Sequence, residues 1–563
     1  MAGHPLDRRE FLRRAALAAP WVAGVACAPL TRRPRAAHEL AADLVIIGGG
    51  LGGCAAALAA ARNGRRVLMT EETDWIGGQL TQQAVPPDEN RWIETIGGTR
   101  SYRALRDGIR AHYYRRPTLL QRARENPRLN PGNGWVSRLC CEPRAALAVL
   151  HEMLAPYLAT GQVRLLLRHC AIAADIEHDR VRAVLVRHMD DGTTTTLVAP
   201  YFADATELGD LLPLTRTEYV TGAESRAQTG EPHAKEEPQP DNVQGFTMCF
   251  AMDYLAGEDH AIERPHEYAA WRDVVLTAAN GAPYRLVSFE DADSQRIGFD
   301  PAARKGFWTY RRIIDRDLFA PGASASDITI VNWAQNDYSF GSLIDVAPDV
   351  AARHVERARQ LSLSLLYWLQ TEAPRPDGGA GWSGLRLRPD VVGTRDGLAM
   401  HPYIRESRRI QAEFTVLEQH VTTEARLREA GRSSRDVTAA AFRDSVGIGH
   451  YSMDLHLTTR GDRGRYGDTL PFQIPLGALI PQRVENLLPA AKNLGVTHLT
   501  NGCYRLHPVE WNVGEAVGSL AAFCLARQRP PRAVRATAAL LQDFQAQLTR
   551  DGVPLGWPSP LPA

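Results

Sequence analysis

DLVIIGGGLGG, residues 43–53, indicates the architecture of this chain more clearly than any other segment. Residues 43–47 form an apolar run rich in β-branched side chains, which is typical of a buried parallel strand. The Ala-rich residues 54–62 predict a helix that ends at a glycine, Gly64, and residues 67–70 predict the next strand. The sequence therefore predicts a strand–helix–strand unit of the α/β class.

The glycines between this strand and this helix match Gly-x-Gly-x-x-Gly, the pattern of a dinucleotide-binding turn. Gly48 permits the tight turn, Gly50 lets the backbone approach a diphosphate, and Gly53 lets the helix pack closely on the sheet. The diphosphate would lie against N–H groups at the positive end of the helix. We expect the cofactor to contact Gly48, Gly50, Leu51, Gly52 and Gly53.

A carboxylate follows at the spacing that a ribose requires. Glu71 closes the second strand 23 positions after Gly48, where it can accept hydrogen bonds from ribose hydroxyls, and Glu72 is its neighbour. An acidic residue here disfavours a 2′-phosphate. The alternative is a glycine-rich turn without a ligand, but the strand, helix and carboxylate around the glycines favour a dinucleotide.

A second glycine pattern favours FAD over a nicotinamide cofactor. Gly77, Gly78, Gln79 and Leu80 resemble the second stretch of glutathione-reductase-like flavoproteins, in which the backbone runs beside the diphosphate and flavin. An ordinary glycine turn is the alternative. Residues 379–384 also match Gly-x-Gly-x-x-Gly, but a Pro-rich segment precedes them, which predicts a loop. The single fingerprint counts against a reductase with separate flavin and nicotinamide domains.

Across residues 43–525 the chain resembles the FAD-dependent oxidoreductase family, the group that includes proteins labelled xanthan-lyase-like. The resemblance rests on both glycine patterns and on three further segments: residues 204–210, 405–409 and 486–518. It implies cofactor contacts at Asp204, Ala205 and Thr206, and it puts Ala171 near the adenine.

The chain departs from the family at two places. The family often has Ala-Thr-Gly-Asp-Gly-Asp where this chain has residues 205–210, so Glu207 and Leu208 are departures. Ala491 and Lys492 replace the Gly-Arg of a common Ala-Gly-Arg motif. These changes leave the fold assignment intact and affect the expected backbone contacts.

The closing segment predicts a helix that packs against the first one, because Gly514, Ala516 and Gly518 are small. By resemblance, the N-terminus of this helix, with Asn512 and Val513, aims N–H groups at the flavin N1–C2=O edge. Reduced flavin carries negative charge there, and fixed dipoles in a dry site stabilise such charge.

Two residues are the catalytic candidates. Arg505 matches a family position near the flavin and would stabilise reduced flavin or bind an anionic substrate. His507 has a pKa range suited to a general base. On a strand, positions two apart share a face, so both side chains would point into the site. The alternative for each is a packing or surface role. Weaker candidates are Asn332, Trp333, Asn336, Asp337, Tyr338, Arg405, Arg408, Arg409, His450 and Tyr451.

The predicted fold class is α/β, with a Rossmann-type FAD-binding domain split in sequence around an inserted α+β substrate or cap domain. We expect an antiparallel insert from strands at residues 163–167, 181–186 and 193–198, and helices at residues 351–370 and 406–420. The predicted divisions are 1–37 (signal peptide and linker), 38–214 (FAD-binding, first part), 215–468 (substrate or cap domain), 469–530 (FAD-binding, closing part) and 531–563 (helical tail).

The first residues predict export. Arg8-Arg9-Glu10-Phe11-Leu12 followed by an apolar run of about 12 residues resembles a twin-arginine signal, although Asp7 replaces the usual Ser or Thr. The run is too short for a permanent transmembrane helix, which needs about 20 residues. We expect a periplasmic or secreted protein carried by the twin-arginine machinery. A lipid anchor at Cys27 and a disordered basic N-terminus are the alternatives.

Composition excludes some functions. The net charge of +1 arises from 65 basic and 64 acidic residues without a long block of one sign, which argues against nucleic-acid binding. The eight cysteines contain no Cys-x-x-Cys, so neither a zinc site nor a dithiol relay is supported and no metal is expected.

These features predict an exported FAD-dependent dehydrogenase or oxidase that moves a hydride from a small organic substrate to flavin N5. Oxygen or a quinone-type acceptor would reoxidise the flavin. Two alternatives stay open: a non-redox lyase or isomerase with structural FAD, and an exported binding protein that retains flavin without turnover.

Overall fold

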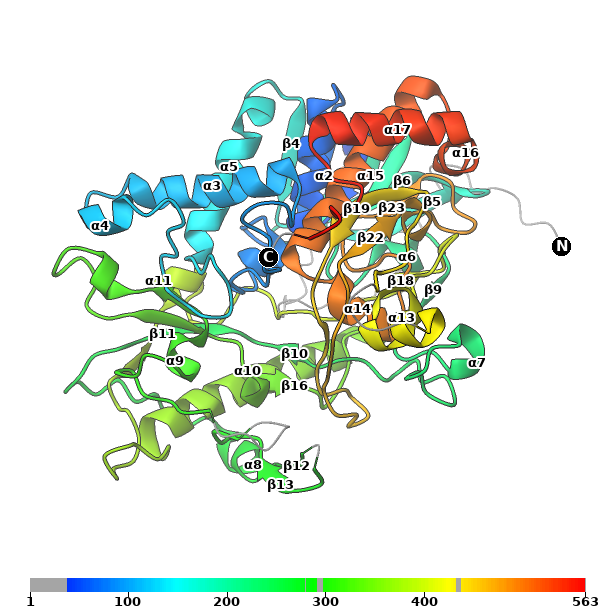
Figure 1. The fold of residues 1–563 in the computed structure, drawn as a ribbon. Helices are drawn as coiled ribbons and strands as arrows, with labels where there is room; N and C mark the ends of the chain where they lie inside the picture. The colour runs from blue at the N-terminus through cyan, green and yellow to red at the C-terminus, as the bar shows by residue number, and fades with distance from the viewer. Residues whose placement is uncertain (1–37, 279, 291–296, 432–436, 562–563) are drawn as a thin grey trace.

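The computed structural model describes residues 38–278, 280–290, 297–431 and 437–561 (Figure 1). The predicted signal peptide, its arginine pair and Cys27 lie outside these residues. No helix in the described part of the chain is long and apolar enough to cross a membrane.

A parallel sheet of five strands organises one half of the molecule, in the order β23-β8-β2-β3-β4. The predicted strand–helix–strand unit is confirmed as β2 (Leu44–Ile47), α2 (Leu51–Arg62) and β3 (Val67–Glu71). On the two sides of this unit lie β4 (Val163–Leu167), β8 (Tyr201–Asp204) and β23 (Leu487–Pro489). A strand from residues 487–489 therefore extends a sheet begun more than four hundred residues earlier.

Residues 163–167 form a strand, as predicted, but the prediction that this strand belongs to an antiparallel insert is wrong. This segment is β4, which pairs in parallel with β3, because α5 (Pro143–Ala159) precedes it and returns the chain in the same direction. The antiparallel part of the neighbouring sheet consists of β5 (His169–Glu177), β6 (Arg180–His188) and β7 (Thr194–Val198), and β1 (His38–Ala41) adds to β7 in parallel.

Two helices cross in unusually close contact. An ideal Cβ on Gly514 of α15 (His507–Arg527) would lie 1.9 Å from the carbonyl oxygen of Gly52 in α2, and one on Gly518 would lie 2.2 Å from that of Ala56. No side chain fits at these distances, so the predicted packing of the two helices through small residues is confirmed. This contact fixes the C-terminal segment onto the start of the dinucleotide turn.

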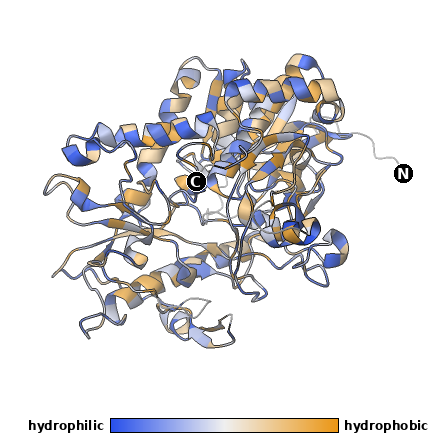
Figure 2. Cartoon of the chain, viewed as in Figure 1, coloured by the Kyte–Doolittle hydropathy of each residue, from blue (hydrophilic) through white to orange (hydrophobic). Residues whose placement is uncertain are grey.

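The other half of the molecule has its own apolar core, around an antiparallel sheet in the order β14-β15-β11-β17 and the long helix α10 (Figures 1 and 2). The predicted helix at residues 351–370 is confirmed as α10 (Pro348–Thr371). The sheet strands are β11 (Phe250–Tyr254), β14 (Arg312–Ile314), β15 (Ile328–Val331) and β17 (Leu385–Leu387).

The helix predicted for residues 406–420 is wrong. The chain is extended there, with β18 (Arg409–Ile410) and only one helical turn, α12 (Glu418–Val421). The charged side chains that suggested a helix face are buried: Arg409 pairs with Glu224 at 2.9 Å and with Glu406. Tertiary ion pairs, rather than a solvated helix surface, account for the spacing of these charges.

The helical tail predicted after residue 530 contains α16 (Pro531–Ala536) and α17 (Ala538–Asp551). Residues 379–384 lie in a loop before β17, as predicted. Other helices and strands are α3 (Arg100–Tyr114), α4 (Gln121–Arg124), α6 (Leu211–Leu214), β9 (Tyr219–Val220), α7 (Arg226–Thr229), β10 (Phe246–Thr247), α8 (Tyr268–Arg272), β12 (Val275–Thr277), β13 (Pro283–Arg285), α9 (Phe307–Tyr310), β16 (Asp337–Tyr338), α11 (Pro389–Val392), α13 (Thr423–Ala430), β19 (Ser445–Gly449), β20 (Met453–Leu455), β21 (Arg465–Gly467), β22 (Phe472–Pro475) and α14 (His498–Tyr504).

Candidate functional site

A cleft opens where the parallel sheet meets the second half of the molecule. It encloses about 1350 Å³ of empty space, part of it open to solvent. Seven of the predicted cofactor contacts line it: Gly48, Gly50, Glu71, Glu72, Ala171, Ala205 and Thr206. Residues that are far apart in sequence therefore converge as a dinucleotide site requires.

The glycine turn forms the floor of this cleft. Gly48 has a φ of +95°, and a Cβ there would lie 2.3 Å from the carbonyl oxygen of Ala205. Gly50 caps α2 without any side-chain hydrogen bond. Glycine backbone therefore faces the cleft at the positive end of the helix, with the Glu207 carboxylate beside it, and a helix end of this kind receives a diphosphate.

Glu71 is held by several donors. Its Oε2 accepts from the Gly49 N–H at 2.9 Å, and its Oε1 accepts from the Thr73 N–H at 2.9 Å and the Gln82 amide at 3.0 Å. Burial raises the pKa of Glu71 to about 7 against the lowering effect of these hydrogen bonds. Glu71 thus holds the glycine turn in place, in addition to the ribose contact that the sequence predicts. Glu72 is partly exposed, and burial, Asp210 and Glu71 raise its pKa to about 8.

The glycine doublet lies directly against this turn. The Gly77 N–H donates to the Gly49 carbonyl at 2.7 Å, and Gly77 and Gly78 both have positive φ. The Gln79 amide donates to the Arg505 carbonyl at 3.0 Å and to Glu510, and Leu80 is buried. The doublet therefore joins the dinucleotide turn to the junction between α14 and α15.

The departures from the family pattern form a buried charge cluster beside the turn. Lys492 pairs with Glu207 and lies 3.7 Å from Glu510, whose Oε1 accepts from the Gly52 N–H at 3.2 Å. Within the described residues, Glu207 Oε1 has no hydrogen-bond partner, and it lies near Gly50 and Gly78. Lys492 balances the charge of the carboxylate that replaces a glycine.

Asp204 does not line the cleft, but it holds the loop that does. Its carboxylate accepts from the Thr206 N–H at 3.0 Å, the Thr206 hydroxyl at 2.7 Å and the Leu211 N–H at 3.1 Å. These bonds fold the loop after β8 so that Ala205 and Thr206 line the cleft.

The predicted strand around Arg505 and His507 is wrong. Arg505 caps the C-terminus of α14, and His507 is the first residue of α15. The two side chains therefore point to different surroundings. His507 Nδ1 accepts from the Asp88 N–H at 3.1 Å and Nε2 donates to the Val85 carbonyl at 3.2 Å, while burial lowers its pKa to about 4. A general base needs a free nitrogen, so the base role of His507 stays a prediction that requires these bonds to break.

Asn512 and Val513 lie in the second turn of α15, because the helix begins five residues earlier than Asn512, at His507. The Asn512 amide group bonds with β19: Oδ1 accepts from the Ile448 N–H at 3.1 Å and Nδ2 donates to the Val446 carbonyl at 3.3 Å. Their contact with flavin stays a prediction, and in this geometry the free helix N–H groups belong to residues nearer His507.

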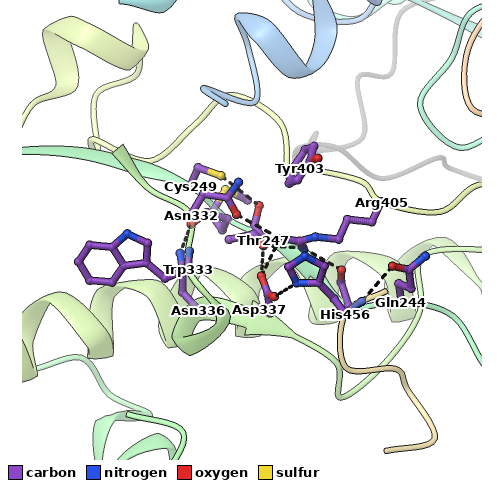
Figure 3. Close-up of polar contacts among 12 residues, drawn as sticks. Gln244, Thr247, Cys249, Asn332, Trp333, Asn336, Asp337, Tyr403, Arg405 and His456 are labelled. Atoms are coloured by element: carbon purple, nitrogen blue, oxygen red, sulfur yellow. Dashed lines mark hydrogen bonds and ion pairs between the residues drawn. The ribbon is translucent and has the colours of Figure 1, made fainter. Parts of the chain in front are cut away.

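A ring of mostly buried polar side chains lies beyond the cleft, and Figure 3 shows four of its members, Asp337, Tyr403, Arg405 and His456. Arg405 contacts Asp337 at 2.9 Å, and Asp337 contacts His456 Nδ1 at 2.5 Å. His456 Nε2 lies 3.3 Å from Asp454, which pairs with Arg505 at 3.0 Å. Arg505 donates to the Tyr403 hydroxyl at 2.7 Å, and the Arg405 guanidinium lies 4.8 Å from the Tyr403 ring centroid. These six residues are named the charge ring: Asp337, Tyr403, Arg405, Asp454, His456 and Arg505.

Of the weaker sequence candidates, Asn332, Asp337 and Arg405 meet in or beside the charge ring, where the Asn332 Oδ1 accepts from Arg405 at 3.1 Å. Trp333 points away from the ring in Figure 3 and packs on Phe307. Arg408 and Arg409 are ion-pair partners elsewhere. His450 packs on Trp92, with their ring centroids 5.1 Å apart.

Asp454 and His456 were missed. They lie at alternate positions on and just after the short strand β20, so their side chains share a face. The alternation Asp454-x-His456 was the available signal. This signal is weak, because nothing in the local sequence shows that Asp337 and the two arginines lie beside Asp454 and His456.

The chain belongs to the FAD-dependent oxidoreductase family: the model of that family matches residues 43–548. It is therefore an enzyme whose cofactor is FAD. The residues present fit this cofactor, since the glycine turn lines the cleft and the glycine doublet is hydrogen-bonded to that turn.

Several solved structures are similar to this chain, at low sequence identity. The OxyS anhydrotetracycline hydroxylase from Streptomyces rimosus is 12% identical, with 91% of this chain and 68% of that chain covered and a TM-score of 0.34. A geranylgeranyl bacteriochlorophyll reductase-like protein from Thermoplasma acidophilum is 10% identical, with 92% and 85% covered and a TM-score of 0.29. The glycerol-3-phosphate dehydrogenase from Bacillus halodurans complexed with FAD is 14% identical, with 38% and 39% covered and a TM-score of 0.22. Comparison with curated proteins gave no match.

Proposed function

We propose that this protein is an exported dehydrogenase or oxidase that removes a hydride from a small organic substrate. The observation that carries the proposal is that the nucleotide cleft reaches residues next in sequence to those that contact the charge ring. The cleft that contains the glycine turn extends to Met248, Met400 and Pro402. These residues adjoin Thr247 and Tyr403, which contact the arginines of the charge ring.

In this proposal, one half of the molecule binds FAD and the other half binds the substrate. Residues 38–214 and 469–530 form a split FAD-binding domain, and residues 215–468 form an inserted substrate domain. The pairing of β23 with β8 supports the split, and the separate core around α10 supports the insertion.

When bound, FAD supplies N5 as the hydride acceptor. Residues of this chain orient the reactants and hold charge. Arg505 is buried, and its carbonyl accepts a hydrogen bond from Gln79, which follows the glycine doublet. Its fixed positive charge would stabilise negative charge that develops during the reaction. Oxygen or a quinone-type acceptor then completes the cycle.

The test is anaerobic reduction of the purified, FAD-loaded protein by a panel of alcohols, amines and hydroxy acids. We expect at least one donor to bleach the flavin absorption band. A flavin that stays oxidised with every donor overturns hydride removal. If the protein turns over a compound equally well with a redox-inactive FAD analogue, the lyase or isomerase alternative is correct. Tight ligand binding without bleaching or turnover favours the binding-protein alternative.

Export is tested separately, since Arg8 and Arg9 lie outside the described residues. We expect a change of both arginines to lysine to retain the protein inside the cell, whereas the unchanged chain reaches the periplasm or medium. Normal export of the variant overturns the twin-arginine route, and labelling of Cys27 by a radioactive fatty acid would identify a lipid-anchored form.

A further inference from the structure

The charge ring has more positive than negative groups. Burial and Arg405 lower the pKa of His456, but Asp454 and Asp337 outweigh them and raise it, which favours the charged form of the histidine. Burial opposes ionisation of Asp337, yet Arg405 and His456 lower its pKa to about 2. Three cations therefore face two carboxylates, which leaves one uncompensated positive charge.

The unsatisfied groups around the ring are mainly donors. Among the described residues, the Nε atoms of Arg405 and Arg505 and the amide nitrogens of Asn332 and Gln244 are buried without a hydrogen-bond partner. Arg405 and Arg505 are each only 2% exposed. Buried donors without acceptors are costly, so this arrangement calls for a ligand that brings oxygen atoms.

The ring is enclosed but still reachable. Asp454 and His456 keep 25% and 24% of their side-chain surface exposed, whereas both arginines are buried behind them. Thr247 and Tyr403 bond to the two arginines of the ring. Their neighbours in sequence, Met248 and Pro402, line the nucleotide cleft. A small molecule in this position would lie between the ring and the far end of the cleft.

We propose that the charge ring binds a carboxylate group of the substrate, so that the enzyme oxidises a small organic monocarboxylic acid or its carboxylate-bearing relatives. This inference rests on the proposed function. One uncompensated positive charge matches a singly charged carboxylate better than a phosphate or sulfate dianion. The planar guanidinium groups also match the two oxygens of a carboxylate.

The ligand is unidentified, so the test uses simple probes on the FAD-loaded protein: acetate, propionate and benzoate, each compared with its amide. Calorimetry and the visible flavin spectrum report binding. We expect the acids to bind at least tenfold more tightly than the amides at about pH 6. We also expect Arg405→Gln to weaken acid binding at least tenfold, whereas Arg535→Gln, which removes an arginine paired with Glu413 and Asp444, leaves it unchanged.

A second measurement needs no variant, which matters because Arg405→Gln leaves Asp337 without its main partner. Acid binding to the unchanged protein should weaken as the pH rises through the elevated pKa of His456, while amide binding stays constant. The charged groups facing this histidine are Asp337, Asp454 and Arg405. Simple carboxylates stay ionised above about pH 6, so the probes themselves do not titrate.

The outcomes separate this inference from the proposed function. Equal binding of acids and amides, or tighter binding of sulfate than of any acid, overturns the carboxylate site even if neutral donors bleach the flavin. Acid binding with the expected Arg405→Gln effect supports the site even if no donor bleaches the flavin, in which case hydride removal is the part that fails.

Discussion

The nucleotide cleft and the charge ring adjoin each other, yet they are built in opposite ways. The glycine turn of the cleft is formed by the backbone of residues that lie close together in sequence, and Glu71 fixes this turn. The charge ring consists of large charged side chains from four distant segments, around residues 337, 403–405, 454–456 and 505. The glycine turn of the cleft depends on the absence of side chains, and the charge ring depends on ion pairs between side chains.

The largest expected effect is on the ring. Asp337→Ala removes the carboxylate that joins Arg405 to His456, and it leaves two buried cations facing each other. Breaking a buried ion pair from one side costs about 3–5 kcal/mol, because the remaining charge is uncompensated. Urea unfolding of the FAD-loaded protein measures the loss.

The matched control is Asp349→Ala, which breaks the exposed pair with Arg353, where both side chains are more than half exposed. An exposed pair of this kind contributes little to stability, because solvent screens the two charges. Similar losses for the two variants would contradict the view that the ring depends on buried pairing.

The next effect is on the cleft. Gly514→Ala places a methyl group 1.9 Å from the Gly52 carbonyl oxygen and forces α15 away from α2. Overpacking of this kind costs about 1–3 kcal/mol, and flavin retention should fall as well because the dinucleotide turn shifts. Gly298→Ala is the control, since no atom of the described residues lies within 4 Å of its added carbon. Unchanged stability and flavin content in Gly514→Ala would refute the close contact.

The same contrast explains what the sequence could predict. Gly48, Gly50 and Glu71 reveal the cleft because their spacing is local and each residue type has one physical use there. The helix predicted at residues 406–420 failed because tertiary ion pairs hold Glu406 and Arg409 in an extended segment. The strand predicted at Arg505 failed because two helices, residues 498–504 and 507–527, meet there. Asp454 and His456 acquire meaning only when Asp337 and Arg505 are brought beside them, which no local pattern records.

The third effect is a pH dependence of stability that belongs to the ring. The folded pKa of His456 is raised, so its contribution to stability is fully present below the unfolded pKa, near 6.5, and is lost as the pH rises through the folded value. The loss amounts to about 1.4 kcal/mol for each pH unit between those two pKa values. His456→Gln should remove this part of the profile.

The comparison of profiles isolates the histidine, because the buried carboxyls Glu71 and Asp204, whose pKa values are raised to about 7, titrate in both proteins. Their raised values make stability fall as the pH rises through the acid range, between about pH 4 and pH 7. Identical profiles for the two proteins would show that His456 is not held between two carboxylates.

The smallest effect distinguishes the two neighbouring carboxylates of the cleft. Glu71 accepts hydrogen bonds from Gly49, Thr73 and Gln82, whereas Glu72 is partly exposed at the rim. Glu71→Gln should weaken FAD retention about three- to tenfold, because a neutral amide holds the Gly49 N–H less strongly than a carboxylate does. Glu72→Gln should change retention less than about threefold. Dialysis against increasing urea, followed by flavin fluorescence, ranks the variants. If Glu72→Gln releases FAD more readily than Glu71→Gln, then the ribose is held at the rim, and Glu71 serves the turn alone.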